Sequence, residues 1–219
     1  MLSRCDYSFL CIASVVALAA GGCSGGPPRT TPPAIDAEAA GKQAIAIYDK
    51  DGDGAISGKE LDNCPGIKDA LEHFDINHDG KITAAAIAVR IREWQESNVG
   101  TAATKVRVLL DGQPLEGATV TLEPEPFLGS NVAAASGQTA KNGATILTIA
   151  ADSGNPQGER KPGVHYGLYK VRISKQVGGK ESLPARYNVN TELGVEIGPR
   201  HTESRQFNLT GQQQSGRTR

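Results

Sequence analysis

Two twelve-residue stretches of this chain, 26 positions apart, carry oxygen-bearing side chains at alternate residues around a central glycine. The first, "DKDGDGAISGKE", runs from Asp49 to Glu60, and the second, "DINHDGKITAAA", runs from Asp75 to Ala86. Hard cations such as Ca²⁺ take roughly six to eight oxygen ligands, and alternate residues on a tightly turned loop can supply most of them. These residues therefore favour the binding of a divalent cation.

The first stretch resembles a calcium loop of the EF-hand type, in which ligands occupy positions 1, 3, 5, 7, 9 and 12 and a glycine at position 6 makes the sharp turn. Gly54 stands at the turn position, and Glu60 stands where a bidentate carboxylate closes the site. The ligands that the resemblance implies are Asp49, Asp51, Asp53, the backbone carbonyl of Ala55, Ser57 and Glu60. We expect this segment, called loop one below, to bind Ca²⁺ strongly.

The second stretch, called loop two, repeats the pattern but ends in Ala86. Its expected ligands are Asp75, Asn77, Asp79, the backbone carbonyl of Lys81, and Thr83. Ala86 removes a bidentate carboxylate, which is two oxygens of about seven. Loop two is therefore either a weak metal site or a structural partner of loop one. Ile56 and Ile82, at position 8 of each loop, are expected to form the short antiparallel bridge that joins paired EF-hand loops.

The residues around the loops predict the helices that hold them. Apolar residues recur at helical spacing before each loop and predict two incoming helices. They are Ala44, Ile45 and Tyr48 before loop one, and Ile67, Ala70, Leu71 and Phe74 before loop two. Pro65 and Gly66 should separate a short outgoing helix, starting at Leu61, from the second incoming helix. A last helix is expected over about residues 84–97, with Trp94 on its apolar face.

The C-terminal half changes its hydrophobic period from 3.6 to 2 residues. Val106, Val108 and Leu110 alternate with polar neighbours, and further short apolar runs are bounded by Gly, Pro, Asn or Asp. They predict about seven strands and a β-sandwich of roughly 105 residues. The segments "DGQPLEGATVTLEPE", "SGQTAKNGATILTIA" and "GVHYGLYKVRISK" resemble the prealbumin-like or carboxypeptidase-regulatory-like sandwich. The predicted fold class is thus α+β multidomain, a helical EF-hand pair followed by an all-β prealbumin-like sandwich.

The N-terminus has the pattern of an export signal. Arg4 precedes the apolar run from Phe9 to Ala20, and small residues lead to Cys23. This pattern resembles a bacterial lipoprotein signal, in which the cysteine is lipidated after cleavage; simple secretion is the alternative. The arrangement as a whole, with "EPFLG" and "LPARYNVNTELGVEI", is similar to small planctomycete-type lipoproteins that join an EF-hand pair to this sandwich.

The expected organisation of the chain has five parts. They are a signal peptide at 1–22, a Gly/Pro-rich tether at 23–34, the EF-hand pair at 35–98, the β-sandwich at 103–211 and a disordered tail at 212–219. Residues 36–80 carry eleven acids and four bases, whereas residues 81–219 carry twelve acids and seventeen bases. This polarity favours a cation-binding front part and argues against nucleic acid as a partner.

Few residues outside the loops suggest catalysis. His165 lies far in sequence from His201 and Glu203, which lack a third metal ligand at useful spacing, and no GxSxG nucleophile motif occurs. Cys64 is expected to be a small buried residue. Arg186 and Tyr187 are expected to complete a strand end, and the alternative is that they form a ligand platform. We therefore expect a protein that is not an enzyme.

These patterns together predict the function and the location. We expect a calcium-binding, non-catalytic protein of the bacterial cell envelope, held at the membrane through lipidated Cys23 and in contact with a possible envelope protein. The alternative function is a dockerin-like interaction module, in which the EF-hand pair recognises an envelope or extracellular partner. An exposed apolar patch on residues 61–74 or 84–97 would favour that alternative.

Overall fold

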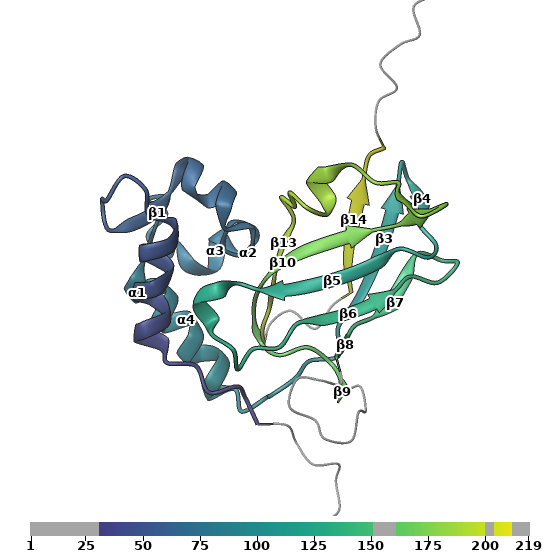
Figure 1. The fold of residues 1–219 in the computed structure, drawn as a ribbon. Coiled ribbons are helices and arrows are strands. Elements are labelled where there is room, and N and C mark those ends of the chain that lie inside the picture. The colour runs from purple at the N-terminus through teal and green to yellow at the C-terminus, as the bar shows by residue number, and fades with distance from the viewer. Residues whose placement is uncertain (1–30, 151–160, 200–203, 212–219) are drawn as a thin grey trace, which may run out of the picture.

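The computed structural model describes residues 31–150, 161–199 and 204–211 of the 219-residue chain (Figure 1). The predicted signal peptide, Cys23, most of the tether, His201, Glu203 and the predicted tail lie outside these residues. Within the described part of the chain, no helix combines the length and the apolar character needed to cross a bilayer.

A helical region comes first and contains both loops. Its elements are α1 (Ala37–Tyr48), β1 (Ala55–Ser57), a 3₁₀ helix η1 (Gly58–Asn63), α2 (Pro65–Asp69), α3 (Leu71–Phe74), β2 (Lys81–Thr83) and α4 (Ala84–Glu96). Asp36 caps α1 by accepting a hydrogen bond from Ala39 N, and Thr83 caps α4 by accepting one from Ala86 N. A methyl group on Gly41 would lie 2.3 Å from Ala84 O, so this glycine lets α1 approach the start of α4 closely.

The segment between the loops differs in detail from the prediction. The expected outgoing helix is a 3₁₀ helix, and the expected second incoming helix is divided into α2 and α3 at Ala70, whose backbone leaves helical geometry. Cys64 lies before Pro65 and takes φ −122° and ψ 70°, because a proline disfavours helical geometry at the residue before it. The predicted break at Pro65 and the last helix near residues 84–97 are both confirmed.

The two loops are joined as predicted. Strands β1 and β2 pair in antiparallel fashion, and Ile56 lies opposite Ile82. Both isoleucine side chains are fully buried, so their apolar contact stabilises the pairing of the loops without any metal.

The β-rich region consists of two larger sheets and a small hairpin (Figure 1). The six-stranded sheet has the order β13-β10-β5-β6-β8-β9, with β13 Gly194–Ile197, β10 Gly167–Ser174, β5 Thr119–Pro124, β6 Ala135–Gln138, β8 Thr148–Ile149 and β9 Lys161–Pro162. The four-stranded sheet contains β14 (Arg205–Leu209), β3 (Lys105–Leu110), β4 (Gln113–Pro114) and β7 (Ala144–Ile146). Strands β11 (Gln176–Val177) and β12 (Lys180–Glu181) form the hairpin. The predicted order of a helical EF-hand region followed by a β-sheet-rich part is confirmed.

The strands with clear alternation were the predictable ones. In β3 the buried side chains of Val106 and Val108 alternate with the exposed ones of Lys105 and Arg107, as a period of two requires. Strand β6 and the hairpin β11–β12 escaped prediction, because the sequence of β6, "ASGQ", is small and polar and the hairpin is exposed on both faces. The pairing of β14 parallel to β3 has no local signal, since the two strands are about a hundred residues apart.

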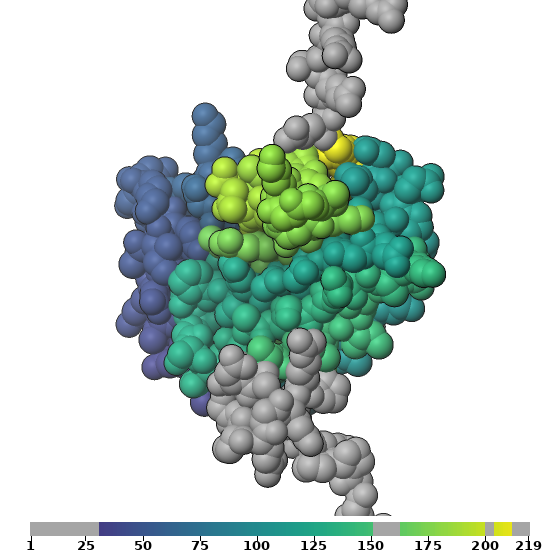
Figure 2. Space-filling model, turned by 45° about the vertical axis from the view of Figure 1, so that its right-hand side comes forward, coloured from purple at the N-terminus to yellow at the C-terminus, as the bar shows by residue number. Residues whose placement is uncertain are grey.

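The helical region packs directly on the edge of the six-stranded sheet, and one apolar core runs through both regions. Helix α2 lies against β13 and β10, and Figure 2 shows the helical region in close contact with the β-rich region. A Cβ on Gly194 would lie 1.8 Å from Pro65 O, and one on Gly66 would lie 3.1 Å from Tyr169 N. These contacts between backbones place the loop segment on the sheet.

Candidate metal centre

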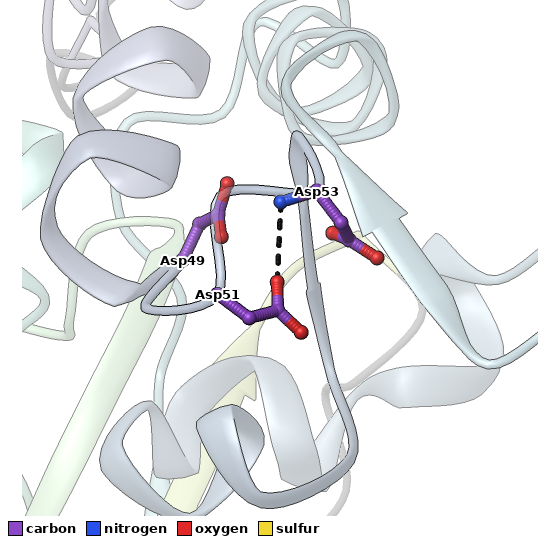
Figure 3. A group of neighbouring side chains, drawn as sticks. All are labelled: Asp49, Asp51 and Asp53. Carbon is purple, nitrogen blue, oxygen red and sulfur yellow. Dashed lines mark hydrogen bonds between the residues drawn. The ribbon is translucent and has the colours of Figure 1, made fainter.

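Loop one begins where α1 ends, and its first three acidic side chains gather in a cluster. Asp49, Asp51 and Asp53 each offer a carboxylate oxygen, and these oxygens all lie within 4.8 Å of one another (Figure 3). Oxygens bound to one Ca²⁺ at about 2.3–2.6 Å can be at most about 5 Å apart. The three carboxylates therefore fit a common Ca²⁺ ion.

Hydrogen bonds within loop one produce this arrangement. Asp49 accepts from Gly52 N at 2.6 Å and from Gly54 N at 2.9 Å. Asp51 accepts from Asp53 N at 3.1 Å, as Figure 3 shows. Gly54 has φ 84°, a left-handed conformation that is strained for a residue with a side chain. The turn and the side-chain bonds together direct the loop around a small central space.

Glu60 closes the loop from the other end. Its Oε1 accepts from Lys50 N at 2.5 Å and Asp51 N at 3.2 Å, and its Oε2 accepts from Ser57 N at 3.0 Å. The hydrogen bonds from Lys50 and Ser57 lower the pKa of Glu60, so the side chain is a carboxylate at neutral pH. Glu60 thus lies over the beginning of loop one, although it does not belong to the three-aspartate cluster.

The remaining predicted ligands of loop one lie on its paired strand. Ala55 and Ser57 are the first and last residues of β1, and Ala55 donates its N–H to Asp53 Oδ1 at 3.0 Å. The structure therefore places all six predicted positions on one continuous loop.

Loop two shares with loop one the hydrogen bonds made by its glycine and by the residue after it, and it has fewer acids. Asp75 accepts from Asp79 N at 3.0 Å and Gly80 N at 2.8 Å, and Asp79 accepts from Lys81 N at 2.8 Å. Asn77 directs its amide nitrogen to Asp79 Oδ2 at 2.8 Å. The turn at Gly80 is therefore bonded like the turn at Gly54, whereas the residues before it make different hydrogen bonds in the two loops.

The closing carboxylate is missing from loop two. Ala86 lies in the first turn of α4, and its N–H is bonded to Thr83 Oγ1 at 3.3 Å. The hydroxyl of Thr83, another predicted ligand, is therefore engaged as a helix cap. The cluster of three acidic groups found in loop one has no counterpart among the acids of loop two.

A lysine of loop two reaches the metal ligands of loop one. Lys81 Nζ lies 2.8 Å from Asp53 Oδ2, and both side chains are partly exposed. The hydrogen bond from Lys81 lowers the pKa of Asp53, and the same bond raises the pKa of Lys81. The sequence indicated a positive charge near loop two but gave no sign that it would pair with loop one.

Two buried carboxylates beside the loops were not predicted. Glu125 follows β5 and Glu196 lies in β13; both are fully buried, and both accept hydrogen bonds from the helical region. Their partners are 59 to 123 residues away in sequence. The one sequence signal was an acid within a predicted apolar strand, and it applies to Glu196 in "GVEI".

The other candidates from the sequence have structural partners. Arg186 and Tyr187 lie in a short 3₁₀ helix, η3 (Ala185–Tyr187), rather than at the expected strand end, and their side chains bond to Thr210, just after β14. His165 accepts from Ala133 N at 3.2 Å. Cys64 is fully buried, as expected, and burial raises the pKa of its thiol, so it is not a reactive thiolate.

A groove of about 420 Å³ lies between α2, β13 and β14, away from the loops. Two basic side chains line it, and each already has an acidic partner: Lys68 pairs with Asp62 and Arg205 with Asp69. The positive charges of Lys68 and Arg205 are therefore already paired and are not free to bind an acidic ligand.

The helix faces that a docking module would need are covered. The large apolar side chains of residues 61–74 and 84–97 are buried or half-buried except Val89, which is 43% exposed. This part of the chain therefore lacks the exposed apolar patch that would favour the dockerin-like alternative.

The comparison with known families agrees with the geometry of the loops. Residues 42–64 and 67–85 match the EF-hand family, and these two segments contain loop one and most of loop two. The match covers less than half of the chain and does not include the β-rich region. No curated protein matches the chain. The helical region is therefore similar to a pair of EF-hands, a class of motif that binds calcium.

Proposed function

We propose that this protein binds Ca²⁺ at loop one through Asp49, Asp51, Asp53, the Ala55 carbonyl, Ser57 and Glu60. The observation that carries the proposal is the cluster of three aspartate oxygens within 4.8 Å, in a segment that matches the EF-hand family. Glu60 supplies the fourth carboxylate from the same loop. Four negative charges around one small space favour a divalent cation over a monovalent one.

Loop two is the weaker site in this proposal. It has two acidic ligands, lacks the closing carboxylate, and its Thr83 hydroxyl caps α4. Its main contribution is then the paired strand β2, which holds β1 and with it one side of loop one.

A calcium titration of the purified protein tests the proposal. Isothermal calorimetry should find one dominant equivalent, and Glu60→Ala should remove it, because a bidentate ligand and a charge are lost. Glu72→Ala, which changes an exposed glutamate of α3, is the matched control and should bind as the unchanged protein does. Two equal sites, or full binding by Glu60→Ala, would contradict the assignment.

The location that we propose is the bacterial cell envelope, with Cys23 as the lipidated N-terminus. The support is the basic, apolar and small-residue succession that ends at Cys23. Outside the cytoplasm free calcium is high, so an affinity on the order of 10⁻⁴–10⁻³ M suffices and the role is structural rather than fast signalling. Among the residues that the structure describes, the acidic cluster of loop one is the group that suggests chemistry, and we propose a non-catalytic protein.

Mass analysis of the native protein tests the anchor. A mature chain that begins at Cys23 with added acyl mass supports lipidation, and Cys23→Ser should then release the protein from the membrane fraction, because acyl chains supply the membrane affinity. An unmodified N-terminus between residues 20 and 30 would instead indicate a secreted calcium-binding protein.

A further inference from the structure

Glu125 is a buried carboxylate of the β-rich region that holds the two ends of the loop-one segment. Its Oε2 accepts a hydrogen bond from Tyr48 Oη at 2.7 Å, and its Oε1 accepts one from Gly66 N at 3.3 Å. Tyr48 is the last residue of α1, directly before the first metal ligand, Asp49. Gly66 is the second residue of α2, just after η1. One side chain thus contacts the residues just before and just after the segment 49–63.

The position of Glu125 is rigid. The side chain is fully buried, and its own N–H donates to Leu168 O at 2.9 Å, which connects it to β10. Lys170 Nζ, the nearest cation, lies 3.9 Å from its Oε2. A buried carboxylate that loses one of its few hydrogen-bond donors is strongly disfavoured. Movement of Tyr48 or Gly66 away from Glu125 is therefore resisted.

Loop two has a corresponding carboxylate. Glu196 of β13 lies 2.7 Å from His73 Nδ1, just before that loop, and accepts from Arg90 Nε at 2.7 Å and Trp94 Nε1 at 2.8 Å after it. The six-stranded sheet therefore contacts the flanks of each loop through a different buried acid. This parallel supplies a matched control, because the hydrogen bonds of Glu196 to His73, Arg90 and Trp94 all go to the flanks of loop two.

We propose that Glu125 is a positioning residue for calcium: by holding Tyr48 and Gly66, the β-rich region sets the affinity of loop one. The inference rests on the proposed function of loop one. Because the ends of the loop are already held in place, calcium binding does not have to order them, and the affinity of loop one for calcium is higher. By thermodynamic reciprocity, calcium in loop one also tightens the contact of the helical region with the sheet.

Two variants of the full chain test the proposal by calorimetric titration with Ca²⁺. Tyr48→Phe removes only the hydroxyl, and Glu125→Gln keeps the shape but removes the charge. Both should raise the Kd of loop one by about five-fold or more, at the low end of coupling between sites. If Glu125→Gln does not fold, Tyr48→Phe still tests the proposal. If the unchanged protein binds no calcium, the proposed function and this inference both fail.

Controls separate positioning from a general loss of stability. Val108→Ala truncates a fully buried side chain of β3 and lowers stability without touching the loop flanks. Val108→Ala and Glu196→Gln should each leave the Kd of loop one within about two-fold of the unchanged protein, well below the change expected for coupled sites. Calcium should also slow hydrogen exchange at Gly66 N in the unchanged protein and in Val108→Ala, but not in Glu125→Gln. An unchanged Kd in Tyr48→Phe, or an equal rise in Val108→Ala, would overturn the inference while leaving calcium binding intact.

Discussion

Lys81 Nζ of loop two lies 2.8 Å from Asp53 Oδ2 of loop one, so a cation from one loop already occupies part of the carboxylate that the other loop offers to a metal. In the register of β1 and β2, Lys81 lies opposite Ser57, and its side chain extends from there to Asp53. The two loops are thus connected by charge as well as by the buried contact of Ile56 with Ile82. Ca²⁺ that binds Asp53 must compete with, or displace, the ammonium group.

Lys81→Met should therefore strengthen calcium binding at loop one. An exposed ion pair contributes little, because water screens it, so the Kd should fall by no more than roughly five-fold. The improvement should shrink at high salt, because salt screens exposed charges. Lys68→Met, which removes the same charge from the pair with Asp62, is the control for net charge. Equal affinity in Lys81→Met and Lys68→Met would exclude a direct competition.

Ala86→Glu should convert loop two into a second calcium site. Ala86 is half-buried in the first turn of α4, where a negative charge is favoured by the helix dipole, and the new carboxylate supplies the closing ligand that loop two lacks. Calorimetry should show the stoichiometry rise from about one to about two. Ala85→Glu places the same charge one residue earlier and should not add a site. Unchanged stoichiometry in Ala86→Glu would show that the missing acid is not what weakens loop two.

Glu125 should make stability depend on pH. Burial raises the pKa of Glu125 above its usual 4.5, although the bond from Tyr48 opposes this shift. The folded state then holds the proton more tightly than the unfolded chain, so the stabilisation is full below the unfolded pKa and decreases as pH rises through the folded one. Glu125→Gln should flatten this decrease, measured by chemical unfolding with chelator as the pH rises from about 4.5. If Glu125→Gln loses as much stability with rising pH as the unchanged protein does, the pH dependence comes from other groups.

Gly194→Ala should weaken the contact between the two regions. The new methyl would lie 1.8 Å from Pro65 O, a backbone atom that moves only with α2. Overpacking of this kind costs about 1–3 kcal/mol, measured as a lower free energy of unfolding. Gly167→Ala, in the neighbouring strand, is the matched control, because its methyl would meet the flexible side chain of Leu128 at 3.2 Å. Equal losses in both variants would show that the close approach at Gly194 is not the cause.

Much of the candidate site could be predicted because its determinants are local. Alternating acids and Gly54 encode the turn of loop one, and the bonds that shape it span five residues or fewer, apart from those of Glu60 to Lys50 and Asp51. Ile56 and Ile82 could be paired because the loops repeat the same pattern. The helix from Ala84 and the alternating strands β3 and β10 were likewise visible as hydrophobic periods.

The split of α2 from α3, the short exposed strands and the two buried glutamates could not be predicted in the same way. A glutamate in a strand normally faces water. The residues near Glu125 and Glu196 in sequence do not indicate that their partners are Tyr48 and Arg90, respectively. Their burial depends on where α2 lies on the sheet, which the close approach of Pro65 to Gly194 decides.

The sequence alone determined which residues can hold a cation and that the second loop lacks its closing acid, because ligand spacing on a tight loop is a property of twelve consecutive residues. Only the tertiary structure decided that Lys81 faces Asp53 and that a carboxylate of the β-rich region holds both ends of loop one. Those relationships join residues 28 and 77 positions apart. Pairing of the two loops brings Lys81 to Asp53, and packing of the helices on the sheet brings Tyr48 to Glu125.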